Sequence, residues 1–353
     1  MNFGFRISDF GFDGASGFGL LNPKSDPGAP GPKSFRDHRA PRDWRRPWLD
    51  PPGFLLPNCP CCGGGGGASQ NYHVFGGTTL GTPSTRQASN YQWSSGWTTK
   101  SPLSSARDSM AASTPSVGGS AYTYGGVSNS AFLTQSDSYA PDTWSTNTAM
   151  SSPSRYRSAG VAISSLAYSW GGWNSSNVTQ SRNDQMTPGS PSSWTTKSAM
   201  IAARSNSVAA AIGANGYNVC GADSSNANTA TNYQYSPSGD AWTTKTACPA
   251  PAKNGLAGFS ISGVMYVTYG APDTTRRNDG YVVDTWSSFA TAPGALTQYL
   301  ASASIDASGV GWATGGTTNG ATALVQHSEF VPNAWASRTG IPQAVINAVG
   351  SPA

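Results

Sequence analysis

The amino-acid sequence predicts an all-β protein built from six copies of one short unit. Three observations support this prediction. Two markers, a glycine doublet and a tryptophan, recur six times in constant order, with the doublet reduced to Cys220-Gly221 and Tyr269-Gly270 in two copies. Short runs of alternating apolar and polar residues lie between turn-forming clusters of Gly, Asn, Pro and Ser. Charged residues make up only 11% of the chain, whereas Thr and aromatic residues, which favour strands, are abundant, with 12 Trp and 14 Tyr.

The tryptophans set the period of the repeat. They are Trp97, Trp144, Trp194, Trp242, Trp286 and Trp335, with gaps of 47, 50, 48, 44 and 49 residues. Upstream of each one, the second glycine of the doublet falls at Gly77, Gly126, Gly172, Gly221, Gly270 and Gly316. Most units also have an aromatic residue before the tryptophan: Tyr91, Tyr139, Tyr235, Tyr281 and Phe330. Periods of about 40 to 50 residues are typical of propeller blades or helical arrays.

Each unit is predicted to contain four short strands. Runs such as 207–212 and 264–267 alternate, and no segment keeps a 3.6-residue period. The units resemble the kelch repeat, in which a Gly-Gly doublet closes the second strand and a Tyr and then a Trp follow. The resemblance covers residues 71–353 and implies a six-bladed β-propeller of four-stranded blades around a central channel. We therefore predict two parts, a Gly/Pro-rich extended N-terminal arm or linker over 1–70 and the propeller over 71–353.

The markers have structural roles that follow from their chemistry. Glycine at a strand end permits positive φ and close approach of another backbone, which assigns this role to Gly77, Gly126, Gly172 and Gly316. A tryptophan in every blade can fill the wedge between adjacent sheets. Six positions after each tryptophan the residue is apolar, which predicts a further core position: Leu103, Met150, Met200, Cys248, Ala292 and Ile341.

The two ends of the repeat region predict how the ring closes. The first unit begins at its second strand, at residues 73–77. The last unit continues into residues 344–350, where Val345 and Val349 fall like Val208 and Ile212. We therefore predict that this C-terminal segment forms the inner strand of blade one, which removes the open seam between the first and last blades.

Residues 1–70 have a different composition, with Pro-Gly steps and a cationic cluster over 36–46. Low apolar content argues against an independent core. One interpretation is a linker without fixed structure. The other is an arm that orders on another protein subunit, with Trp44, Trp48 and Phe54 as anchors. The first residues lack the charged-then-apolar order of a secretory signal, and no apolar run is long enough for membrane insertion. The net charge of +4 is small for this length, and no Lys/Arg-rich block of the kind that binds nucleic acids occurs, so no nucleic-acid partner is predicted.

The five cysteines give weak signals. Cys59, Cys61 and Cys62 are the only tight cluster of candidate metal ligands, and a structural zinc site usually needs four ligands. An intermolecular disulfide is an alternative for this cluster. Cys220 occupies a glycine position and Cys248 an apolar one, so we expect two buried core thiols rather than a redox pair. No cofactor is predicted.

One face of the predicted propeller carries a candidate site. Loops after the second and fourth strands open on the same face and would bring together cations, amides and an aromatic: Arg107, Arg155, Arg204, Lys253, Asn129, Trp173, Asn174, Asp223 and Asp273. The cations have two interpretations. They brace neighbouring blades, or they bind an anion or glycan with Trp173 stacked on a sugar.

Enzymatic alternatives find little support in the residues. Copper radical oxidases share this type of propeller, but their site needs two histidines beside tyrosines and a cysteine, and the only histidines here are His38, His73 and His327. Sialidase-like catalysis needs a Tyr–Glu pair, and Glu329 is the only glutamate. A carboxylate pair for glycoside hydrolysis, drawn from Asp223, Asp273 and Asp306, stays open.

The composition suggests where such a protein works. A surface rich in Ser, Thr, Asn and Gly and poor in Lys and Glu resembles extracellular and virion proteins. We expect a non-catalytic binding or structural propeller on an extracellular assembly, such as a virion tail, a decoration component or a cell surface. The arm would attach it to other subunits, and one face would recognise a ligand, with cell-surface glycans as the candidate. The alternative is a secreted carbohydrate-active enzyme, either a hydrolase or an oxidase.

Overall fold

The structure is a computed structural model that describes residues 71–80, 84–272, 275–294, 299, 302–305, 309–318 and 322–352, with only the backbone of 302–305. Two compact units divide the chain, 1–64 and 65–353. The predictions for Trp44, Trp48, Phe54, Cys59, Cys61, Cys62, Asp273 and Asp306 lie outside the described residues. In the part that is described, no helix is long and apolar enough to cross a membrane.

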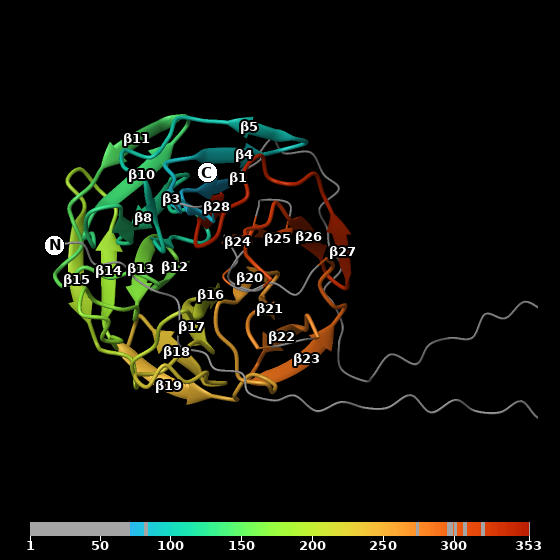
Figure 1. The fold of residues 1–353 in the computed structure, drawn as a ribbon. Helices are drawn as coiled ribbons and strands as arrows, with labels where there is room; N and C mark the ends of the chain where they lie inside the picture. Colours follow the sequence, from blue (N-terminus) through green and yellow to red (C-terminus); the bar gives the residue numbers. More distant parts are fainter. Residues whose placement is uncertain are drawn as a thin grey trace, which may run out of the picture. The chain divides into compact units, whose positions relative to one another are not determined.

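Six four-stranded antiparallel sheets form a ring, and each sheet is one blade (Figure 1). From the channel outward, blade one consists of β28 (Val349–Pro352), β1 (Tyr72–Phe75), β4 (Asn90–Trp93) and β5 (Trp97–Thr99). Blade two consists of β7 (Ala111–Ala112), β8 (Ala121–Tyr124), β10 (Ser136–Ala140) and β11 (Thr143–Thr146). Blade three consists of β12 (Ala159–Ile163), β13 (Leu166–Trp170), β14 (Asn183–Thr187) and β15 (Ser193–Lys197).

The remaining blades repeat this order. Blade four consists of β16 (Val208–Ile212), β17 (Asn215–Val219), β18 (Asn232–Ser236) and β19 (Ala241–Lys245). Blade five consists of β20 (Ala257–Ile261), β21 (Val264–Thr268), β22 (Asn278–Val282) and β23 (Thr285–Phe289). Blade six consists of β24 (Ser302–Ile305), β25 (Gly311–Thr314), β26 (His327–Val331) and β27 (Ala334–Ser337). Two short pairs join β2 (Thr78–Thr79) to β3 (Thr85–Arg86), and β6 (Arg107–Asp108) to β9 (Val127–Ser128).

The C-terminal strand closes the ring as predicted. β28 pairs antiparallel with β1, from Tyr72 opposite Pro352 to Phe75 opposite Val349. The inner strands then contact one another around the channel in the order β28, β7, β12, β16, β20, β24 and back to β28. The predicted register of this segment is wrong by four residues, because Val349 rather than Val345 takes the place of Val208. A valine starts either register, so the apolar pattern alone does not distinguish them.

The six tryptophans join each blade to the one before it. Every indole N–H donates a hydrogen bond of 2.9–3.0 Å to the carbonyl four positions after the tryptophan of the preceding blade. Three residues whose carbonyls accept an indole N–H also donate their own backbone N–H to a carboxylate, at 2.7–3.0 Å: Ser101 to Asp142, Ser198 to Asp240 and Thr246 to Asp284. Because these bonds stabilise the ionised carboxylate, they help to lower the pKa of all three aspartates.

Each tryptophan also faces a bulky side chain on the third strand of its own blade. Five of the six are aromatic, and the third blade has Met186 opposite Trp194. In blade one the partner of Trp97 is Trp93 rather than the predicted Tyr91. Only four positions separate the paired residues in blade one, against five to eight in the other blades, so counting back from the tryptophan misplaced this position by two residues.

The glycine doublets allow the backbone of the connections that enter and leave their blade to approach closely, and the second glycine faces the connection that enters. The second glycine has φ of +88° to +97° in every blade. A Cβ at Gly126 would lie 2.5 Å from the Asp108 carbonyl oxygen, and one at Gly221 would lie 2.6 Å from that of Ser205. No larger residue fits this position without moving the backbone, which explains why it is glycine in all six units.

The first position of the doublet faces the core position that follows the tryptophan. A Cβ at Gly125 would lie 3.1 Å from Met150 Cε, and one at Gly171 would lie 3.0 Å from Met200 Cε. The two positions therefore share one volume. Glycine accompanies a long side chain in four blades, and in blade five Tyr269 accompanies the small Ala292 within one core cluster.

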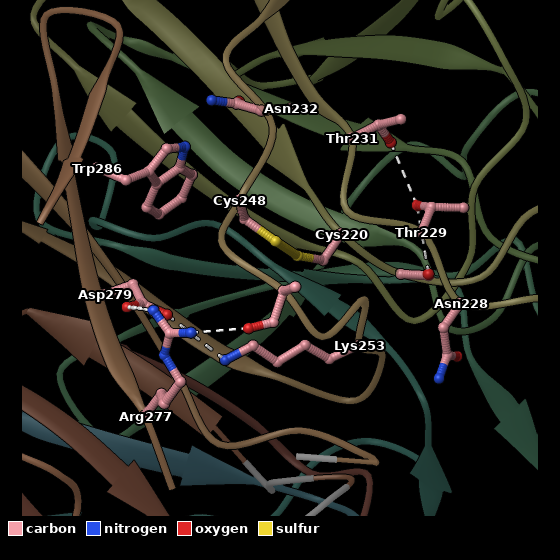
Figure 2. The surroundings of a disulfide bond; sticks show 12 residues. Cys220, Asn228, Thr229, Thr231, Asn232, Cys248, Lys253, Arg277, Asp279 and Trp286 are labelled. Carbon is pink, nitrogen blue, oxygen red and sulfur yellow. Dashed lines mark hydrogen bonds and ion pairs between the residues drawn. A yellow bond between two sulfur atoms is a disulfide. The ribbon is translucent and has the colours of Figure 1, made fainter. Parts of the chain in front are cut away.

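In blade four both positions are cysteines, and they form a disulfide (Figure 2). The prediction of two separate buried thiols is therefore wrong. The two side chains occupy the volume that glycine and methionine share in blades two and three, so they meet directly. Cys220 is fully buried and has a left-handed backbone with φ of +59°, like the first glycine of the other doublets.

Candidate functional site

Strand direction places two kinds of loop on one face of the propeller, which we call the mouth face. These are the loops between the second and third strands and the connections from each outer strand to the next inner strand. The mouth face carries the residues that the sequence singled out as a candidate site. The third-to-fourth strand hairpins open on the opposite face.

The four predicted cations are buried braces within this face. Arg107 pairs with Asp137 at 2.5 Å, and Arg155 pairs with Asp184 at 2.5 Å. Lys253 lies 3.8 Å from Asp279 (Figure 2). Each side chain is 0–1% exposed, and each reaches the third strand of the blade that its connection enters.

Arg204 uses a different partner in the same geometry. Its guanidinium donates to Tyr233 Oη at 3.0 Å and to Thr231, because blade four has tyrosine where blades two, three and five have aspartate. Burial lowers the pKa of Arg155 to about 10 and lowers that of Arg107. The carbonyl of each of the four cations also accepts the N–H of the second glycine in the preceding blade. None of the four lines the central recess.

A closed ring of backbone hydrogen bonds surrounds the channel on the mouth face. Its six members lie two positions after the cation position of each connection, and all have φ between +50° and +63°: Ser109, Arg157, Asn206, Gly255, Tyr299 and Asn347. Each N–H donates to the carbonyl of the preceding member, at 2.8–3.5 Å, and Ser109 donates to Asn347 to complete the circle. This ring was not predicted from the sequence. Asparagine or glycine at three of the six positions is a weak sign of a left-handed backbone.

A recess of about 150 Å³ lies in the channel at this ring. Small side chains of the inner strands form most of its wall: Ala111, Ala112, Ala159, Ala209 and Ala257. Arg157 is the only charged residue among the described residues that line it. The recess is below the range of about 300–1,000 Å³ usual for drug-sized ligands, so only a small molecule or one end of a larger one can enter it.

Arg157 lies between two aromatic rings at the entrance of the recess. Its guanidinium carbon is 4.9 Å from the centre of the Trp173 ring and 5.5 Å from that of Tyr299. Arg157 and Tyr299 occupy opposite positions in the hydrogen-bonded ring, three members apart. Gly255 stands beside Tyr299, and a Cβ there would lie 3.1 Å from Tyr299 Cδ1. Glycine therefore makes room for the tyrosine ring over the channel.

An aromatic row, formed by Phe132, Tyr156 and Trp173, runs outward from Arg157. Ring centres are 5.5 Å apart between Tyr156 and Trp173 and 5.2 Å apart between Tyr156 and Phe132. Trp173 is half-buried and donates from Nε1 to Thr179 Oγ1 at 2.9 Å. Of the predicted site residues, Trp173 is the one that lies next to the recess through Arg157.

The other predicted side chains organise their own loops. Asn174 Oδ1 accepts the backbone N–H groups of Ser176 and Val178 at 3.0 Å. Asp223 Oδ1 accepts those of Ser225 and Ala227 in the same way, at 2.8 and 3.0 Å. Asn129 is exposed, and Asp273 lies outside the described residues.

The two histidines of the propeller are buried in aromatic surroundings. Burial lowers the pKa of His73 from 6.5 to about 4 and that of His327 to about 3. His327 stacks on Trp312 with ring centres 4.8 Å apart, and its Nδ1 lies 2.8 Å from Thr314 Oγ1. No group of three or more His, Cys, Asp or Glu able to hold a metal ion occurs within the described ranges.

Comparison with known proteins gives the class of fold. No protein-family model matches the chain, and no curated protein matches it. Among solved structures the chain is similar to "Structure of YjhT", with a TM-score of 0.57 and 14% sequence identity, over 69% of this chain and 87% of that chain. YjhT is a six-bladed kelch-repeat propeller. This chain has the kelch-type fold. At 14% identity the similarity concerns the fold alone.

Proposed function

We propose that this kelch-type propeller is a non-catalytic binding module of an extracellular assembly, such as a virion tail, a decoration layer or a cell surface. The mouth face recognises the ligand, and glycans are the candidate class. Residues 1–70, outside the described residues, attach the propeller to other protein subunits of the assembly.

The aromatic row beside the channel is the observation that carries this proposal. Sugar rings present apolar C–H faces that pack on exposed aromatic side chains, while polar groups around them fix orientation. Phe132 and Trp173 remain accessible at the two ends of the row. The loops around them are rich in Asn, Ser and Thr, which supply neutral donors and acceptors for sugar hydroxyls.

Exposed apolar side chains are also more frequent on this face. Six large hydrophobic residues are exposed within the described residues, and four of them lie in loops of the mouth face: Phe132, Val178, Ile201 and Val325. The opposite face has Val283 and Val331 in its hairpins. This asymmetry supports recognition through the mouth face.

The disulfide supports the extracellular setting. Disulfides such as that between Cys220 and Cys248 form and persist mainly in oxidising environments outside the cytosol. The low content of charged residues, 11%, is in keeping with the composition of extracellular and virion proteins noted above.

A glycan array probed with the full chain tests the proposal. We expect binding to a restricted set of glycans, reduced at least tenfold in Phe132→Ala and Trp173→Ala. Val331→Ala is the matched control, because Val331 is 38% exposed, like Phe132, but lies on the opposite face. Equal binding by all three variants, or turnover of the bound glycans, would contradict a non-catalytic recognition face.

A further inference from the structure

The entrance of the central recess combines one cation with several polar side chains that lack partners. Arg157 forms no ion pair with any described residue, and its buried Nε has no hydrogen-bond partner there. The buried cations Arg107 and Arg155, two positions earlier in their connections, each have an aspartate at 2.5 Å. Arg157 therefore differs from them, because no residue that the structure describes neutralises its charge.

Three further members of the hydrogen-bonded ring carry polar side chains: Ser109, Asn206 and Asn347. Their backbone groups complete the ring, whereas their side chains make no hydrogen bond to any residue that the structure describes. Asn206 and Asn347 occupy opposite positions in the ring, like Arg157 and Tyr299. The entrance thus offers a guanidinium, two carboxamides and a hydroxyl, all capable of donating hydrogen bonds.

Among the described residues that line the recess there is no carboxylate that could compete for these donors. Asp108, the nearest acidic residue in the chain to the ring, already pairs with Arg86 at 3.1 Å and accepts a hydrogen bond from Thr78. The rest of the lining is mostly alanine, valine and glycine, together with Met110 and Leu256 and the hydroxyl side chains of Thr114, Ser158 and Ser207. The chemistry of the recess therefore changes from cationic and polar at the ring to mainly apolar within the channel.

We propose that this recess is a binding site for a small organic carboxylate, held by Arg157 at the entrance with its apolar part in the channel. This proposal deepens the proposed function and rests on it in one respect, namely that the ligand binds at the mouth face. A planar guanidinium matches the two oxygens of a carboxylate, and such charge-assisted hydrogen bonds are stronger than neutral ones. The two aromatic faces hold the guanidinium plane in place and limit its access to water.

The size of the recess sets the size of the ligand. A water molecule has a share of about 30 Å³ in the liquid, so 150 Å³ corresponds to roughly five waters. Propionate and butyrate, with about that number of non-hydrogen atoms, fit this scale. Tyr299 reaches the same opening from the opposite side of the ring and contacts the guanidinium through its aromatic ring.

Titration of the full chain with sodium propionate, followed by calorimetry and by the thermal midpoint, tests this site. Chloride at equal ionic strength serves as the reference. We expect propionate to bind and to raise the thermal midpoint of the native protein, since a ligand that binds only the folded state stabilises it. Arg157→Gln should weaken binding at least tenfold. Arg157→Lys should weaken it less, because it keeps the charge and loses the planar fork.

Lys245→Gln is the matched control, because it removes one positive charge from the outer strand of blade four, away from the channel. It should bind propionate like the native chain. Absence of propionate binding, or equal binding by Arg157→Gln and Lys245→Gln, would overturn the proposal. Since the titration uses no glycan, its failure is distinct from a failure of the proposed glycan recognition. If propionate binds but no glycan on the array does, only the proposed glycan recognition is contradicted.

Discussion

The indole N–H of Trp97 donates a 2.9 Å hydrogen bond to the carbonyl of Thr339, across 242 residues of chain. In the other five blades the same bond joins consecutive repeats, separated by 40 to 46 residues. Here it joins the first blade to the last. Together with the pairing of β28 and β1, it closes the ring at the outer rim as well as at the channel.

Removal of residues 349–353 should destabilise the whole propeller. This deletion removes β28, which leaves the channel-side edge of β1 unpaired and exposes the core of blade one. We expect loss of the cooperative thermal transition or a fall of more than about 10 °C in its midpoint, on the scale of about 2–4 °C per kcal/mol for domains of this size. Removal of Ala353 alone, which lies beyond β28, should leave the midpoint unchanged. Equal behaviour of both truncations would refute the closing role of this strand.

Reduction of the disulfide should lower stability by about 3 to 4 kcal/mol. This value follows from the loop-closure entropy of a cross-link that spans 28 residues. Urea unfolding with and without a reductant measures the change. The double variant Cys220→Gly with Cys248→Met installs the pair found in blades two and three, and it should unfold identically in both conditions. If the native chain is equally insensitive to reductant, the disulfide does not contribute as described.

Stability should fall as the pH is lowered from about 6.5 towards 4. The pKa values of His73 and His327 in the folded chain are about 4 and about 3, whereas an unfolded histidine titrates near 6.5. Between these values the unfolded chain binds more protons, so acid favours unfolding, by up to about 1.4 kcal/mol per pH unit for each histidine. Denaturant titrations across this range measure the slope.

Other blades provide variants that should reduce this acid sensitivity. Tyrosine occupies the position of His73 in blades two to five, and asparagine occupies that of His327 in blades one, three, four and five. The charged groups near the two histidines are Lys100 and Asp142 for the first and Arg338 for the second. His73→Tyr with His327→Asn keeps all three and should flatten the slope. An unchanged slope would assign the acid sensitivity to other groups.

Replacement of Val283 by asparagine should stabilise the protein. Val283 is 89% exposed and has φ of +47°, followed by Asp284 at +59°. Such a hairpin turn strongly prefers asparagine or glycine, and a β-branched residue at positive φ is unfavourable. We expect a gain of about 0.5 to 1 kcal/mol in the free energy of unfolding. Val331→Asn, at an exposed strand position with ordinary backbone, should give no gain, and an equal gain there would contradict the argument from φ.

The repeat architecture could be predicted from the sequence because its markers act locally. The positions of Gly126 and Trp144 have equivalent neighbours in every blade, so each copy of the repeat has the same physical constraint. The shared volume between the doublet and the core position was harder to see. Cys220 and Cys248 each match an apolar pattern separately, and only the contact between Gly125 and Met150 in another blade shows that such positions meet.

The candidate site was less predictable for a related reason. Cations at regular spacing suggested a charged rim, yet Arg107 and Arg155 have aspartates 29 or 30 residues later, on the third strand of the next blade. That pairing depends on strand register, which composition does not reveal. Arg157 occupies a position that repeats in every blade, but the residue type at that position does not repeat. Its place at the channel follows from a left-handed backbone that several residue types adopt there.

The circle of main-chain bonds around the channel has an evolutionary corollary. The hydrogen bonds of this ring use only backbone amide and carbonyl groups. Side-chain substitutions can therefore change which molecules enter the channel without breaking the ring, at Ser109, Arg157, Asn206, Tyr299 or Asn347. Serine, arginine, asparagine and tyrosine already alternate there on an unchanged backbone. Natural variation or protein engineering can therefore change ligand selectivity at these five positions while the backbone stays the same.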